Sequence, residues 1–413
     1  MRAPDGGAED VAVVVLPSAP LPLRSGGTRR AYALIEAMEC AGARPLLLAA
    51  ADEGDADAVR ARGWKIEVHA PPARRTITQR ARQQVQRLPL APVPSLERRV
   101  RELAHAGVAW VQLEEFRSLG YRTAARSGGT RVVVSLYNVD SRLLSGRAFA
   151  RSGAAEALKS RWRVARIAHQ ERAAARTVDA LLCVSAADER HFATAGGCVV
   201  VVPNGVGEGL FEVAALPEEG PEHVLFSAQY AYAPNREGIL RFLREGWPRL
   251  SEARPAARLR LTGPDVPPEL ERLAAADERI DLLGFVPSIE AELELAGVVV
   301  VPLWEGGGTR LKVVEAMAAA RPVVGTPLGV EELGFRDGEH GLVAGDPLGL
   351  ADGCAALLSD RARARGLGLA GRAHADAVRW PRATAPARDL YAGWLAQDAQ
   401  RSQPPSPAPA LLP

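Results

Sequence analysis

Short apolar runs recur along the first half of the chain and alternate with stretches in which apolar residues follow helical spacing. Runs of this length bounded by turn residues predict buried strands, and the order strand, helix, strand predicts right-handed parallel units. The predicted helices include 28–41 and 153–177. The predicted strands of this half are 11–16, 45–50, 109–113, 131–136, 180–184 and 199–203.

The same alternation restarts after a Gly-, Glu- and Pro-rich stretch, 205–222, whose composition is typical of a linker. The second set of strands is nearly continuous in Val, Leu and Ile, as expected for a parallel sheet covered on both faces. Strands are expected at 224–227, 257–262, 280–283, 297–302, 322–326 and 341–344. Helices are expected at 237–251, 268–276, 290–296, 309–319 and 347–359, followed by helical stretches over 362–397.

This pattern predicts an α/β fold class with two tandem Rossmann-like, doubly wound domains facing across a cleft. The expected organisation is an N-terminal domain at 9–205, a linker at 206–222, a C-terminal domain at 223–375 and a terminal helix at 376–397. The Pro-rich end of the chain, 398–413, is expected to be disordered.

Composition narrows the class of protein. The 413 residues are enough for two domains, 47% of them are apolar, and the net charge of +2 is not that of a nucleic-acid binder. The four cysteines form no CxxC pair and no His spacing completes a zinc site. The N-terminus does not read as a signal peptide, and the apolar runs fall short of the roughly 20 residues that cross a bilayer. We therefore expect a cytoplasmic protein without nucleic-acid partners.

The most informative segment is VVVVPLWEGGGTRLKVVEAMAAARPVVGTPLG, residues 298–329. A buried strand leads into a glycine loop, and a helix is expected to open at Thr309. In open α/β sheets, ligands bind beyond the carboxyl ends of the strands. A glycine backbone can approach an anion closely, and a helix N-terminus carries partial positive charge, to which Arg310 and Lys312 add two full charges. The segment predicts a diphosphate site whose loop glycines are Gly306, Gly307 and Gly308.

Glu315 lies seven residues after Gly308, close to two helical turns, and is therefore expected on the same face as the loop. Its carboxylate would be about one diphosphate length from the phosphates. This spacing suits a carboxylate that accepts hydrogen bonds from ribose hydroxyls, as an acidic residue does in dinucleotide-binding folds.

The segment resembles the donor-site signature of the retaining glycosyltransferases of family 4, whose fold is called GT-B. The similarity extends over nearly all of 11–395, and the order and spacing of its motifs are more specific than any one of them. The other motifs are the glycine loop within 18–29, PNGV at 203–206, FSAQYAYAPN at 226–235, LLGFVPSI at 282–289 and TPLGVEEL at 326–333.

The resemblance implies a nucleotide-sugar donor held by the C-terminal domain and an acceptor held by the N-terminal domain. Glu315 would bind the ribose, and Arg310 and Lys312 would be the cations for the diphosphate. The backbone of Gly306, Gly307, Gly308 and Thr309 would contact the donor, and Phe285 and Val286 would border the base. Gly26 and Gly27 would close over the phosphates from the N-terminal domain, and the segment around Trp380 would belong to a terminal helix that braces it.

Three departures from the family pattern affect the site. Many relatives carry two glutamates separated by seven residues, but the first of these falls here at Gly307. Glu305 lies two residues out of register, and it either substitutes as a catalytic residue or is a loop carboxylate. The Arg and Lys that many relatives place after the first C-domain strand are replaced by Gln229, Tyr230 and Asn235. An HNVE-like motif reads YNVD, so Tyr137 stands where a His normally lies beside the reacting sugar.

The resulting hypothesis is a metal-independent enzyme that transfers a sugar to an acceptor hydroxyl with retention of anomeric configuration. The acceptor could be a polysaccharide precursor, a lipid carrier or a small molecule, with contacts expected from Glu114, Glu115, Asn138 and Asp140. The alternatives are a sugar-nucleotide epimerase or hydrolase of the same architecture, or a donor-binding partner subunit with little activity. No GxGxxG follows the first strand, which argues against a dinucleotide-dependent oxidoreductase.

Two further patterns have competing explanations. Asp55-Ala56-Asp57 is a DxD, which in another glycosyltransferase fold holds a metal, but its acidic, Ala-rich surroundings favour a solvated loop. The many arginines of 74–101 suit peripheral contact with an anionic membrane, although a charged solvent face is the commoner explanation. We therefore expect no metal, and membrane contact remains an open expectation.

Overall fold

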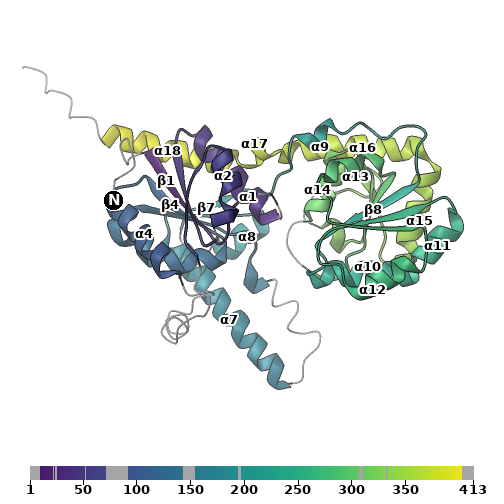
Figure 1. Ribbon diagram of the computed structural model, residues 1–413, viewed down its shortest axis with the longest axis horizontal. Helices are drawn as coiled ribbons and strands as arrows, with labels where there is room; N and C mark the ends of the chain where they lie inside the picture. Colours follow the sequence, from purple (N-terminus) through teal and green to yellow (C-terminus); the bar gives the residue numbers. More distant parts are fainter. Residues whose placement is uncertain are drawn as a thin grey trace, which may run out of the picture. The chain divides into compact units, whose positions relative to one another are not determined.

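The computed structural model describes residues 10–21, 23, 26–51, 53–70, 92–142, 154–193, 197–306, 310–331 and 334–401. The chain forms two compact units, one of Met1–Pro203 with Thr384–Pro413 and the other of Asn204–Ala383. Each unit is a parallel sheet with helices on both faces (Figure 1). The predicted fold class is thereby confirmed.

The first unit contains a seven-stranded sheet in the order β3-β2-β1-β4-β5-β6-β7. The strand β1 pairs with β2 on one side and β4 on the other, so that Val13 lies opposite both Leu46 and Val111. The strands are β1 (Val11–Leu16), β2 (Arg44–Ala49), β3 (Lys65–Val68), β4 (Trp110–Glu114), β5 (Arg131–Ser135), β6 (Ala180–Cys183) and β7 (Val199–Val201).

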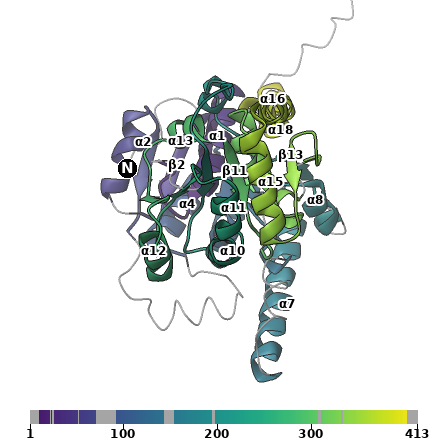
Figure 2. The same ribbon diagram turned by 90° about the vertical axis from the view of Figure 1, so that its right-hand side faces the viewer.

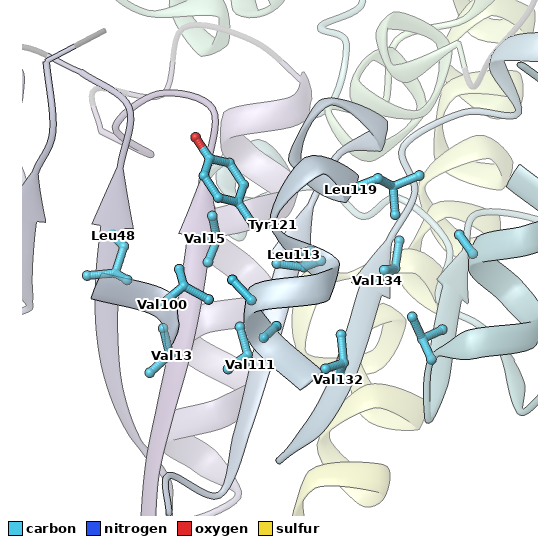
Figure 3. Packing of buried hydrophobic residues seen from close by; sticks show 14 of the residues in the cluster. Val13, Val15, Leu48, Val100, Val111, Leu113, Leu119, Tyr121, Val132 and Val134 are labelled. Atoms are coloured by element: carbon cyan, nitrogen blue, oxygen red, sulfur yellow. The ribbon is translucent and has the colours of Figure 1, made fainter. Parts of the chain in front are cut away.

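Apolar cores cover both faces of this sheet. One core joins alternate residues of the strands to α4 (Pro94–His105) and to residues that follow β4, as Figure 3 shows for Val13, Val100 and Val111. The other core packs the opposite face against α1 (Gly26–Cys40) and α18 (Ala385–Arg401). The remaining α-helices described in this unit are α2 (Asp57–Ala61), α5 (Arg122–Ala125), α7 (Ala154–Thr177) and α8 (Ala186–Phe192).

Helix α18 is anchored to the first unit by specific contacts as well as by burial. The Tyr391 ring stacks on Trp110 with ring centroids 5.0 Å apart, and its hydroxyl donates a hydrogen bond to Gln112 at 2.7 Å. Near the end of the helix, Arg131 pairs with Asp398 at 2.6 Å. The C-terminal helix therefore belongs structurally to the unit that begins the chain.

The second unit contains a six-stranded sheet in the order β10-β9-β8-β11-β12-β13. Figure 2 turns this unit toward the viewer, with α15 and α11 in front of the strands. The strands are β8 (His223–Ser227), β9 (Arg258–Thr262), β10 (Ile280–Gly284), β11 (Val298–Val301), β12 (Val323–Gly325) and β13 (Gly341–Val343). The α-helices described are α9 (Gly209–Glu212), α10 (Ala233–Glu245), α11 (Trp247–Ala253), α12 (Pro268–Ala275), α13 (Ile289–Leu295), α14 (Leu311–Ala318), α15 (Pro347–Ser359), α16 (Arg361–Ala375) and α17 (Trp380–Ala383).

Several element boundaries differ from those expected. The strand β3 was not predicted, and the single helix expected at 237–251 is two helices, α10 and α11, because Gly246 and Pro248 interrupt it. Helix α1 begins at Gly26 rather than near residue 28. Helix α14 begins at Leu311 with Arg310 at the N-cap position, two residues later than expected.

The expected linker is ordered and packs on the second unit. Three arginines donate hydrogen bonds to its carbonyl groups: Arg321 to Ala214 at 2.9 Å, Arg365 to Leu216 at 2.8 Å, and Arg372 to Val213. Each bond supplies a charged donor to a backbone acceptor, which is stronger than a neutral pair. The linker is therefore a fixed part of this unit.

Trp380 also lies in the second unit. Its backbone N–H donates to Val206 at 3.2 Å, and its ring fills the space beside Gly205, where an added Cβ would lie 2.7 Å from the ring. The segment around Trp380 therefore holds the start of the expected linker, and the helix that covers the first unit starts only at Ala385. Among the helices described, none is both long enough and apolar enough to span a bilayer.

Candidate functional site

The order of strands in the second unit creates a switch point between β8 and β11. From β8 the chain proceeds to β9 and β10 on one side, whereas β11 leads to β12 and β13 on the other. The loops after β8 and β11 therefore diverge, and ligands of open α/β sheets bind in the crevice that such loops leave. Helix α10 packs closely on the loop after β11, because a Cβ on Gly238 would lie 1.9 Å from the Pro302 carbonyl oxygen.

Lys312 lies at this switch point, in the first turn of α14, and is half-buried. Its ammonium donates a hydrogen bond to Asn235 Oδ1 at 2.8 Å. The same nitrogen lies 4.4 Å from the centroid of the Phe226 ring, which β8 supplies. Side chains from β8, α10 and α14 thus converge on one cation.

Burial, together with the neighbouring Arg310 charge, lowers the pKa of Lys312 to about 7, whereas Glu315 acts in the opposite direction. A half-buried ammonium with a neutral hydrogen-bond partner has lost part of its solvation, and the charge of Glu315 offsets only part of that loss. An anionic ligand arriving at this nitrogen would restore the charged form. The electrostatics of the site therefore favour an anion.

Arg310 is buried beside Lys312, and its Nη2 donates to the Gly306 carbonyl oxygen at 3.3 Å. Gly306 has φ of +113°, in the region that favours glycine. A Cβ at this position would also lie 2.7 Å from the Tyr232 hydroxyl and 3.1 Å from Pro234. The start of the loop therefore requires glycine, and it places one carbonyl against the Arg310 guanidinium.

The other predicted donor residues have mixed outcomes. Glu315 is buried in α14, close enough to Lys312 to affect its pKa, whereas Glu305 is exposed in the loop before Gly306. Phe285 is 67% exposed and Val286 half-buried after β10, which lies two strands along the sheet from β8. Gly307, Gly308 and Thr309 lie outside the described residues, and their predicted donor contacts remain predictions.

A second set of functional candidates surrounds the start of α1 in the first unit. Gly26 and Gly27 form the first turn of this helix instead of a loop. A Cβ on Gly27 would lie 2.8 Å from the Tyr137 ring and 3.4 Å from a carboxyl oxygen of Glu115. The structure thus brings Gly27, Tyr137 and Glu115 together at the carboxyl end of β4. The predicted closure of Gly26 and Gly27 over the donor phosphates remains a prediction.

Glu114 does not face a cleft as expected, because its side chain is fully buried. It accepts a hydrogen bond from Gln112, whose own oxygen accepts from Tyr391 of α18. Burial raises the pKa of Glu114, while Gln112, Tyr137 and the positive charge of Arg30 act in the opposite direction. Glu114 therefore belongs to a buried polar network behind the surface that Glu115 and Tyr137 form.

Sequence reasoning missed Arg30, the buried cation of this network. Its guanidinium donates to the Val202 carbonyl oxygen at 2.6 Å. Burial lowers the pKa of Arg30, whereas the negative charge of Glu114 acts to raise it. Arg30 occurs in a helix that also carries Arg29 and shows no local signal that distinguishes the two. Its role depends on β4 and β7, which lie far away in the sequence.

The DxD pair and the described end of the arginine-rich segment make ion pairs of their own. Asp55 and Asp57 are exposed, and Asp57 pairs with Arg60 at 3.2 Å. Within the part of the chain that the structure describes, no group of three His, Cys, Asp or Glu side chains could hold a metal. Most of 74–101 lies outside the described residues; of its last turns, Arg99 bonds Glu67 at 2.8 Å and Arg101 lies 3.5 Å from Glu97.

Two doubly wound parallel sheets, with buried cations at the switch point of the second, define a two-domain α/β protein of the GT-B architecture. Residues 24–208 match the family model described as Glycosyltransferase Family 4, and residues 221–360 match that described as Glycosyl transferases group 1. Together these matches span most of the chain. The chain belongs to this family of glycosyltransferases, as the sequence motifs indicate.

Known proteins similar to this chain agree with that assignment. A curated D-inositol 3-phosphate glycosyltransferase of Geodermatophilus obscurus is 36% identical over 159 residues, which are 37% of this chain and 34% of the relative. The alignment thus spans about a third of the relative's length. The solved structure of HepE from Anabaena, in complex with UDP and glucose, has a TM-score of 0.63 at 16% identity and covers 95% of this chain and 99% of its own.

Sucrose-phosphate synthase of Thermosynechococcus elongatus has the same TM-score of 0.63 at 19% identity, again covering 95% of this chain and 99% of its own. At these identities the likeness concerns the fold. Both structures therefore support the GT-B architecture over nearly the whole chain.

Proposed function

We propose that this glycosyltransferase uses a nucleotide-sugar donor whose diphosphate binds at the switch point of the second unit, against Arg310, Lys312 and the start of α14. The observation that carries this proposal is the half-buried Lys312 ammonium, whose partner Asn235 is neutral and whose pKa burial lowers to about 7. HepE, which shares the fold, was solved with UDP and glucose. Glu315, in the same helix, is proposed to bind the ribose.

The reaction follows from where charge develops. The bond between the sugar C1 and the β-phosphate oxygen breaks, and its electron pair passes to the diphosphate. The acceptor hydroxyl oxygen bonds to C1 on the face that the diphosphate leaves, and its proton passes to a phosphate oxygen. Arg310, Lys312 and the helix N-terminus would stabilise the leaving diphosphate through preorganised charge, the type of catalysis that often contributes most.

Retention of configuration, a hexosyl donor and independence from metal ions form part of the proposal. Retention rests on the family motifs, and metal independence rests on two protein cations that could supply the charge a metal otherwise brings. The anomeric configuration of the product, read by NMR, tests the first. Full activity after chelation with EDTA is expected, and loss of activity restored by Mg²⁺ or Mn²⁺ would contradict the second.

The acceptor is proposed to be a hydroxyl of a glycan, lipid-linked or small-molecule substrate bound by the first unit near Glu115 and Tyr137. Asn138 and Asp140 follow Tyr137 and are proposed to contribute to the same surface. A cytoplasmic location and peripheral membrane contact through 74–101 also remain proposals. Co-sedimentation with anionic vesicles, compared with neutral vesicles, tests the membrane contact.

The donor site is tested by thermal shift with UDP-, GDP- and TDP-sugars, because a ligand that binds the native state raises the melting temperature. One of these donors is expected to stabilise the wild type, and Lys312→Met should weaken its binding about tenfold or more, since a hydrogen bond from a charged group is lost. Glu237→Ala, an exposed change on α10, is the control. Equal binding by wild type and Lys312→Met would contradict the site.

A further inference from the structure

Asn235 uses both ends of its side-chain amide at the switch point. Its Oδ1 accepts from Lys312 at 2.8 Å, and its Nδ2 donates to the Gln229 carbonyl oxygen at 3.0 Å. Its backbone N–H donates to Tyr232 at 3.0 Å, and the residue is only 8% exposed. The two groups of an amide are not interchangeable, so rotation of the side chain would break both of its bonds.

Lys312 depends on such a partner for a defined position. A lysine ammonium is a point charge on a flexible four-carbon stem. The Lys312 ammonium lies over the Phe226 ring, but a cation–π contact is only weakly directional. The hydrogen bond to Asn235 is directional, and it ties the ammonium to α10, which Gly238 allows to pack directly on the loop after β11.

The neutrality of Asn235 is as important as its geometry. An aspartate at this position would hold the ammonium equally well but would neutralise its charge before a ligand arrived. An asparagine orients the cation and leaves its charge available to an anion. The other charged groups that affect Lys312 are Arg310, which disfavours its protonation, and Glu315, which favours it.

We propose that Asn235 is a positioning residue that holds the Lys312 ammonium, without neutralising it, at the carboxyl edge of β8 and β11 for the donor's diphosphate. This inference rests on the proposed donor site and adds a determinant of how that site binds phosphate. Many relatives carry an Arg and a Lys in the loop after the first C-domain strand, and this chain lacks them. One oriented lysine, Lys312, would take their place here.

The test measures the affinity of the wild type and of variants for a nucleoside diphosphate at pH 6.5 and pH 8.5 by calorimetric titration. The probe is whichever of UDP, GDP and TDP stabilises the wild type most. The wild type should bind more weakly at the higher pH, because Lys312, with its pKa lowered to about 7, loses its proton over this range. Lys312→Met lacks the ionisable ammonium, so any pH dependence of its binding comes from the ligand and the other groups of the site.

Asn235→Ala should weaken binding about tenfold at pH 6.5, since the bond to a charged donor is lost. Asn235→Asp, which has the same shape, should also bind more weakly, and the loss of affinity between the two pH values should shrink to that of Lys312→Met because the carboxylate keeps Lys312 protonated. Glu237→Ala should match the wild type at both pH values. Melting curves confirm that each variant is folded.

Wild-type affinity and pH dependence in Asn235→Asp would overturn the positioning role. The positioning role would also be overturned if Asn235→Asp lost the same factor of affinity at pH 6.5 and pH 8.5, so that the ratio of its two affinities stayed that of the wild type. A merely structural residue would have this effect. A wild type that binds none of the three diphosphates would instead overturn the proposed donor site.

Discussion

Gly27 shows how closely side chains meet at the start of α1. A methyl group added here would lie 2.8 Å from the Tyr137 ring, closer than nonbonded carbon atoms approach. Glycine is therefore required by the neighbouring side chain rather than by backbone conformation. The position of Tyr137, which replaces the family's His, thus depends on the absence of a side chain in the first turn of α1.

Gly27→Ala is expected to destabilise the first unit by about 1–3 kcal/mol through overpacking, and to reduce turnover by displacing Tyr137. A second change, Tyr137→Ala, removes the clash, so the double variant should be more stable than the sum of the two single effects. Calorimetric melting of the four proteins measures this coupling. Strictly additive effects would show that Gly27 and Tyr137 do not constrain each other.

Lys312 should make the stability of the second unit depend on pH. The pKa of its ammonium is about 7 in the folded protein, against an ordinary value of 10.5, so between these pH values the unfolded chain binds a proton that the folded one does not. Stability contributed through this group therefore rises as pH rises from about 7 toward 10. Melting temperatures of wild type and Lys312→Met over this range should diverge with that sign; parallel curves would contradict the lowered pKa.

The residues of the donor site were predictable where one short segment holds them. Arg310, Lys312 and Glu315 stand within six residues of each other, and the charge pattern beside a glycine loop was enough to single them out. Phe226 and Arg30 were not recognised as functional, because each acts through elements distant in the sequence. Asn235 was identified only as a loop residue, whereas it lies in the first turn of α10.

Parallel strands buried on both faces were the most predictable elements, because near-continuous runs of Val, Leu and Ile are typical of such strands. The strand β3 lacks this signal: its four residues, KIEV, alternate between apolar and polar at the edge of the sheet, and only Ile66 is buried. Helix ends were less predictable than strands. Helix α10 ends before Gly246, where a Cβ would lie 2.6 Å from the carbonyl oxygen of Pro347 in α15. This contact comes from a residue about 100 positions away in the sequence.

Helix α18 should be held to the first unit mainly by Tyr391. Tyr391→Phe removes the hydroxyl that donates to Gln112 and should cost about 1 kcal/mol, whereas Tyr391→Ala empties a fully buried site beside Trp110 and should cost about 3–5 kcal/mol. Melting of the first unit gives both values. Leu348→Ala, an exposed change in α15, is the control. A Tyr391→Ala variant as stable as the wild type would show that α18 is dispensable.

The two units have separate cores, and this predicts separate responses to truncation. Ending the chain after Ala383 removes α18, whose residues complete the core between α1 and the first sheet. The second unit, Asn204–Ala383, keeps all of its strands and both of its cores. Calorimetry of the truncated chain should therefore show a lowered transition for the first unit and an unchanged one for the second. Equal loss of both transitions would contradict this division.

The function proposed for this chain requires the donor's diphosphate to bind at the switch point between β8 and β11. A crystal structure of the protein with the nucleoside diphosphate that stabilises it most tests this directly. We expect phosphate oxygens within hydrogen-bonding distance of Lys312 Nζ and Arg310, with Asn235 still bonded to Lys312. A diphosphate bound away from α14, with Lys312 still held only by Asn235 and Phe226, would contradict it.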